Sequence, residues 1–88
     1  MPTISRFYGI QISLWTGELN HPRPHFHARY AEHDASIAMD TMELLAGSLP
    51  PRALEMTLHW AVMHRAELLA GWEALRAGGR PSRIEPLP

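Results

Sequence analysis

Three of the six histidines in this 88-residue chain lie within seven positions, in the segment HPRPHFHARY. If a strand begins at residue 25, His25 and His27 project from one face about 6.6 Å apart along the chain, because alternate residues of a strand share a face. His21 lies four residues earlier, and the two prolines between it and His25 restrict its position. The spacing can therefore direct up to three imidazoles toward one ion or one phosphate.

Metal binding is one chemistry that this cluster could perform. His21, His25 and His27 would form an open site for Zn²⁺ or another divalent transition metal, with water in the remaining position. No acidic residue completes the set in the adjacent sequence, so a carboxylate would have to arrive by folding. A metal-binding protein or a metal-dependent hydrolase is one hypothesis for the chain.

Phosphodiester cleavage is a second chemistry and needs no metal. His25 and His27 are the candidate base and acid, with His21 as a third candidate, and Arg23 or Arg29 would bind and stabilise the charge that builds on phosphorus. On this hypothesis the chain is a ribonuclease or another phosphodiester hydrolase. The alternative without chemistry is a polar strand face whose histidines are hydrogen-bonded or solvated.

The spacing of apolar residues predicts the elements that hold the cluster. Alternation at period two predicts strands over residues 4–15, 25–32 and 35–39 and a fourth, short one over 41–45, with a loop over 16–24 and a hairpin turn at 33–34. From Arg52 the apolar positions follow helical spacing, which predicts one helix over residues 50–77. It would begin at a Pro-Pro pair and end at a Gly-Gly pair.

These elements predict a single α+β domain over residues 1–88. Residues 1–46 are expected to be mainly strands, forming a small antiparallel sheet of three to four strands packed on one long C-terminal helix. Residues 78–88 are expected to be an extended C-terminal tail. The free edges of so small a sheet favour a homodimer, because edge strands tend to be covered.

Composition narrows the classes of protein. With 45% hydrophobic residues and three tryptophans the chain is globular rather than disordered. No apolar run approaches the roughly 20 residues that span a bilayer, and the N-terminal sequence lacks a secretion-signal pattern. There is no cysteine, so no disulfide or thiolate metal site can form. The expected location is the cytoplasm.

The charged residues argue against a large DNA-binding face. Net charge is −1, and all eight basic residues are arginines, which suit phosphate or carboxylate better than lysines do. One basic and aromatic run, Arg6-Phe7-Tyr8, would suit a contact with RNA, although packing of a strand explains it equally well.

Five segments together resemble one small bacterial family. They are ISRFYGI at 4–10, HPRPHFHARY at 21–30, GSLPPRAL at 47–54, HRAELLAGWEAL at 64–75 and IEPL at 84–87. In this order and spacing they are similar to the family catalogued as domain of unknown function 4160. Arg23 departs from the family, which usually carries another proline there, while His21, His25 and His27 are kept.

The resemblance implies a function but no chemical target. Genes of this family typically lie beside one for a small protein of the family numbered 2442, in a pair similar to a type II toxin–antitoxin module. The chain would be the toxin half and would inhibit growth, and a protein antitoxin would neutralise it by binding. The histidine cluster adds the hypothesis that the toxin acts on RNA or translation through His21, His25 and His27. The alternative is a protein-binding module without chemistry, acting as an antitoxin or a regulator.

Overall fold

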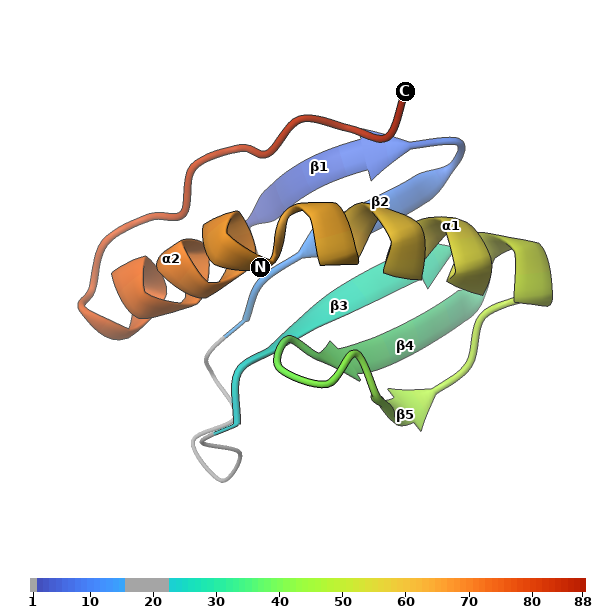
Figure 1. Ribbon diagram of the computed structural model, residues 1–88, viewed down its shortest axis with the longest axis horizontal. Helices are drawn as coiled ribbons and strands as arrows, with labels where there is room; N and C mark the ends of the chain where they lie inside the picture. The colour runs from blue at the N-terminus through green and yellow to red at the C-terminus, as the bar shows by residue number, and fades with distance from the viewer. Residues whose placement is uncertain (1, 16–22) are drawn as a thin grey trace.

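The computed structural model describes residues 2–15 and 23–88. Five strands form one antiparallel sheet in the order β1-β2-β3-β4-β5, and two helices cross one face of it (Figure 1). The elements are β1 (Thr3–Phe7), β2 (Ile10–Ser13), β3 (His25–Tyr30), β4 (His33–Ala38), β5 (Leu44–Gly47), α1 (Pro51–Met63) and α2 (Arg65–Arg76). Because neighbours in the sequence are neighbours in the sheet, each strand pairs with the next without a crossover.

The predicted strand over residues 4–15 is wrong, because it is two strands joined by a tight turn. Phe7 pairs with Ile10, so the turn consists of Tyr8 and Gly9 alone. Both have positive φ, 47° and 81°, which is the signature of a type I′ turn. Such turns favour Asn-Gly, and a tyrosine in the first position concealed the turn within an apparently continuous strand.

Two other boundaries also differ from the prediction. The β3–β4 turn lies at Ala31 and Glu32 rather than at residues 33–34, since Tyr30 pairs with His33. The last strand is β5 over Leu44–Gly47 rather than residues 41–45. The sheet thus has five strands, not the three to four expected.

The expected single long helix is also wrong. The helical segment is two helices of 13 and 12 residues, interrupted at His64, whose backbone lies at φ −118° and ψ 24°. The His64 N–H is shared between the carbonyls of Trp60 and Ala61, and its ring Nδ1 lies 2.6 Å from Oε1 of Glu67. A break of one residue scarcely disturbs apolar periodicity, so the sequence pattern did not reveal it.

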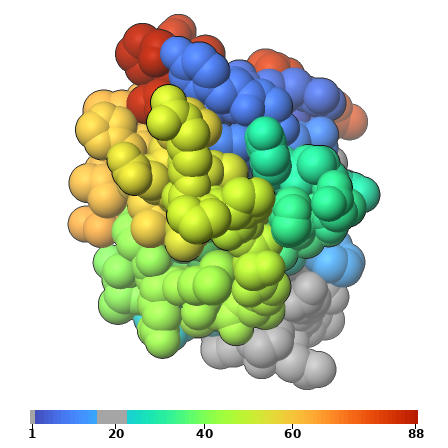
Figure 2. All heavy atoms as spheres, turned by 90° about the vertical axis from the view of Figure 1, so that its right-hand side faces the viewer, coloured from blue at the N-terminus to red at the C-terminus, as the bar shows by residue number. Residues whose placement is uncertain are grey.

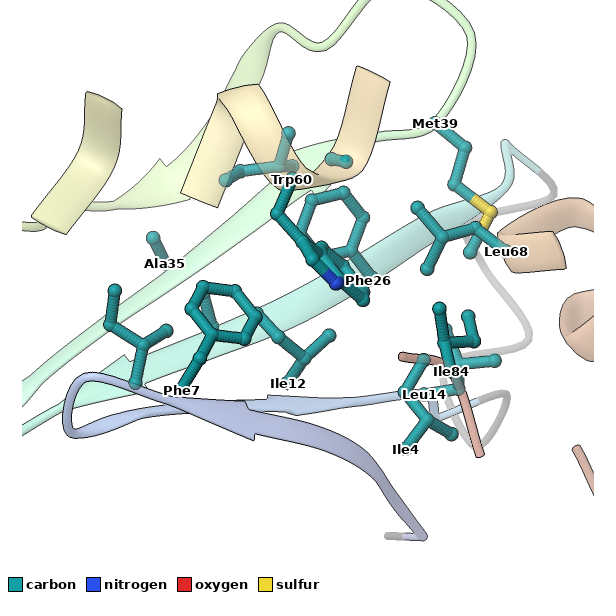
Figure 3. Close-up of a cluster of buried hydrophobic side chains, with 14 of the residues drawn as sticks. Ile4, Phe7, Ile12, Leu14, Phe26, Ala35, Met39, Trp60, Leu68 and Ile84 are labelled. Carbon is teal, nitrogen blue, oxygen red and sulfur yellow. The ribbon is translucent and has the colours of Figure 1, made fainter. Parts of the chain in front are cut away.

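The core lies between the helices and the sheet. Trp60 of α1 is fully buried between Phe7 of β1 and Phe26 of β3, with ring centroids 5.3 and 6.3 Å away (Figure 3). Leu68 and Trp72 of α2 extend the buried cluster over the end of the sheet where Leu14 lies. Burying these large side chains supplies most of the favourable free energy of folding, at roughly 25 cal/mol per Å² of apolar surface.

The C-terminal tail runs in an extended conformation beside β1 (Figure 1). The Ile84 N–H donates to the Ile4 carbonyl over 2.8 Å, and Trp60 Nε1 donates to the Glu85 carbonyl over 2.7 Å. Ile84 is itself part of the core. The tail therefore closes one end of the helix–sheet layer.

Within the described parts of the chain, neither helix is long and apolar enough to cross a bilayer.

Candidate functional site

Strand β3 separates an apolar face from a polar one. Phe26 and Ala28 point toward the helices and are fully buried. His25, His27 and Arg29 alternate with them and form a row along the other side of the strand, although His25, at the first position of β3, reaches Trp72 of α2. This row is the candidate site, and it holds two of the three predicted histidines and one of the two predicted arginines.

His25 is the buried member of the row, with an exposed fraction of 3%. Its ring lies against Trp72 of α2, with centroids 5.1 Å apart. Its Nδ1 lies 3.0 Å from the carbonyl oxygen of Arg23. Because a carbonyl can only accept, Nδ1 carries the proton, and in the neutral ring Nε2 is the basic nitrogen.

His27 is half-buried as a residue, and its Nε2 atom is shielded from solvent. The rings of His25 and His27 meet edge to face with centroids 5.2 Å apart. On its other side, His27 contacts the ring of Trp15, with centroids 5.8 Å apart. The Nδ1 atom of His27 is hydrogen-bonded to the Ser36 hydroxyl at 3.2 Å. Neighbours on both sides therefore fix the position of this imidazole.

Arg23 is already engaged by acidic partners. Its guanidinium donates to Oδ1 of Asp40, to the Thr41 hydroxyl and to Oε1 of Glu43, at 2.9 to 3.3 Å. The hydrogen bond to Asp40 raises the pKa of Arg23. The Thr41 backbone N–H and then the Arg23 guanidinium lower the pKa of Asp40. Arg23 thus ties the segment before β3 to the β4–β5 loop, and phosphate would have to compete with two carboxylates for it.

Arg29 lies in a different environment, exposed at the far end of the row. It faces Gln11 of β2, which in turn faces Arg6 of β1, so two arginines flank a glutamine across three strands. All three line a cavity of about 500 Å³ beside the β1–β2 turn. Of the two predicted phosphate-binding arginines, only Arg29 has its guanidinium available.

The predicted metal site is left incomplete by the described residues. His21 lies outside them, so its place relative to His25 and His27 is not given. Among residues 2–15 and 23–88, no three His, Asp or Glu side chains are placed to hold a metal ion. The two β3 histidines supply two nitrogen ligands, and a metal would need further ligands.

Several neighbours of the histidines escaped sequence reasoning. Trp72 comes from a helix 47 positions after His25, and Ser36 comes from the next strand. Ser13 pairs directly with His27 across β2 and β3 and is buried. Only the strand register could have identified Ser13 and Ser36, and no local signal pointed to Trp72.

Comparisons with known proteins identify a family and nothing finer. No curated protein matches the chain, and no solved structure matches it. One family does match, over residues 9–73, which is well over half of the sequence and includes both β3 histidines. The chain therefore belongs to the family described as domain of unknown function (DUF4160).

Proposed function

We propose that the chain is the toxin half of a bacterial toxin–antitoxin module and inhibits growth by cleaving RNA at the His25–His27 pair. The observation that supports this proposal is the pair itself, two imidazoles 5.2 Å apart on one strand face. Arg29 lies two residues further along the same face. Pairs of positioned imidazoles suit proton transfer near neutral pH.

The tautomer of His25 suggests a division of roles. With Nδ1 donating to the Arg23 carbonyl, Nε2 of His25 would take the proton of the ribose 2′-hydroxyl, and the freed oxygen would attack phosphorus. Protonated His27 would then give its proton to the departing 5′-oxygen. The products are a 2′,3′-cyclic phosphate and a 5′-hydroxyl. The step changes no oxidation state, so it needs neither a metal nor a reductant.

Controlled expression in a bacterial host tests this function. The native chain is expected to arrest growth and deplete bulk RNA, whereas His25→Ala/His27→Ala is expected to do neither. Because His25 is buried against Trp72, the single variant His27→Ala is included, and circular dichroism checks that each variant folds. The control is His59→Ala, which removes an exposed histidine on α1. Growth arrest by a folded His27→Ala protein would refute the proposal.

A binding module without chemistry is the second candidate, and strand β5 favours it. All four residues of β5 are exposed, and Leu44 and Leu45 are 42% and 40% exposed. β5 ends the strand order, so its outer edge pairs with no described strand. Such an edge can take a strand from an antitoxin of the family 2442 type, or from a second copy of the chain.

The two candidates predict different mutational patterns. If binding alone inhibits growth, Leu44→Lys/Leu45→Lys would weaken the effect, because these two leucines are exposed on β5 and lysines on an edge strand oppose pairing with another strand, while the histidine variants would stay active. Metal analysis of protein purified without a histidine tag distinguishes a metal-dependent mechanism from both candidates. Full activity of metal-free protein would exclude that mechanism.

A further inference from the structure

The β1–β2 turn carries an exposed aromatic ring in a strained conformation. Tyr8 is 61% exposed and has φ 47°, a region that costs a side chain with a Cβ about 1–2 kcal/mol. Strain of this kind persists where the surroundings enforce it and is frequent at binding sites. Gly9 follows with φ 81°, and a Cβ there would lie 3.2 Å from the ring of Tyr30. The Tyr30 ring thus leaves little room for a side chain at position 9, and Tyr8 is the exposed aromatic side chain of the turn.

Two arginines lie beside this ring without acidic partners. Arg6 and Arg29 both line the cavity next to Tyr8, and Gln11 lies between them in register. Within residues 2–15 and 23–88, neither guanidinium has an ion pair or a side-chain hydrogen bond. β1 and β3 flank β2, so their Cα atoms are roughly 10 Å apart. At that separation the two side chains can reach consecutive phosphates of one strand.

The cavity lies at one end of the molecule and is small. Figure 2 shows the β1–β2 turn, in blue, next to the β3–β4 turn, in teal, at one end of the molecule. Gln11 is held in place by a hydrogen bond of 3.0 Å from its Nε2 to the Thr3 hydroxyl. Asp34 faces Arg29 across β3 and β4 but is not part of the cavity lining. This cavity, which we call the arginine groove, is thus a small cationic site on a protein whose net charge is −1.

We infer that this groove binds a single-stranded nucleic acid, with Arg6 and Arg29 on the phosphates and a base stacked on Tyr8. Exposed aromatic rings beside unpaired cations are the usual elements of such binding. The inference rests on the proposed function for the identity of the strand as RNA. Since Arg29 follows His27 on the same face, a strand in the groove would extend along β3 toward the histidine pair.

Fluorescence anisotropy with the full chain tests the groove separately from cleavage. The probes are labelled octamers of 2′-O-methyluridylate, which lacks the attacking hydroxyl, and of thymidylate. We expect binding of both or of the ribose octamer alone, and tighter ribose binding would identify RNA as the source. For two phosphate contacts, the slope of log K against log salt concentration is about −1.4, and Arg6→Ala or Arg29→Ala should each reduce it by about 0.7.

Variants distinguish binding at the groove from non-specific attraction between the nucleic acid and positive charge elsewhere on the protein. Tyr8→Ala should weaken binding roughly tenfold or more, and Tyr8→Phe should retain it, because the stacking ring remains. The control Arg76→Ala/Arg80→Ala removes two exposed arginines elsewhere, and we expect it to bind like the native chain. Equal weakening by this control and by Arg6→Ala/Arg29→Ala would overturn the inference, as would binding of thymidylate alone or of neither probe.

The same measurements separate this inference from the proposed function. Binding that depends on Tyr8 and Arg6, together with growth arrest by folded His27→Ala, would keep the groove and reject catalysis at His27. Growth arrest that depends on His27, without binding of either octamer, would keep the proposed function and reject the groove.

Discussion

At the scale of the residue, burial and partners divide the sequence candidates into different roles. His27 is half-buried with its Nε2 atom shielded from solvent, whereas His25 is 3% exposed and rests on Trp72. Arg23 is bound to Asp40 and Glu43, and Arg29 has no acidic partner among the described residues. The sequence identified the residue types and their common face, but it could not rank them, because partners from distant segments determine access.

Tyr8 predicts a trade-off between stability and binding. Asparagine adopts positive φ at much lower cost than tyrosine and is favoured with glycine in type I′ turns. Tyr8→Asn should therefore stabilise the chain by about 0.5–1 kcal/mol, measured by urea unfolding, while it weakens octamer binding. Tyr8→Phe, which keeps the strain, should leave stability nearly unchanged. A Tyr8→Asn protein that is less stable than the native chain would contradict this account of the turn.

At the scale of the element, the sequence predicts the strand that matters most for the site. β3 begins at His25 as expected and keeps the predicted alternation of faces. The errors lie where one residue alters the path of the chain, at Tyr8 in the first hairpin and at His64 between the helices. Neither residue type strongly favours a turn or a helix break, so the apolar periodicity predicts one continuous strand and one continuous helix at these positions.

The tail is held by specific contacts, and trypsin can report on them. Cleavage after Arg83 requires Ile84, whose N–H donates to the Ile4 carbonyl, to leave its buried position. Trp60→Phe removes the hydrogen bond to Glu85, a loss of about 1 kcal/mol, so cleavage after Arg83 should become several-fold faster.

Trp72→Phe provides the matched control for the tail. The Trp72 Nε1 atom is buried and has no hydrogen-bond partner among the described residues, so the same substitution removes no such bond. Its cleavage rate should stay close to that of the native chain. Equal acceleration in both variants would show that loss of ring volume, rather than the anchor to Glu85, releases the tail.

At the scale of the whole molecule, the two faces of the sheet have different surroundings. One face is covered by α1 and α2 and forms the core, while the other presents the β3 row and the arginine groove. Edge strand β5 remains exposed. The proposed toxin would use the β3 row for cleavage and the β5 edge for binding its antitoxin, so the two proposed activities would occupy separate surfaces.

The central claim is that His27 takes part in RNA cleavage, and a purified component assay tests it most directly. Labelled single-stranded RNA is incubated with tag-free native chain, with His27→Ala and with His59→Ala, and its shortening is followed over time. We predict that the native chain and His59→Ala cleave at similar rates and that His27→Ala is slower by about 100-fold or more. RNA left intact by the native chain, or cleaved equally fast by folded His27→Ala, would contradict the claim.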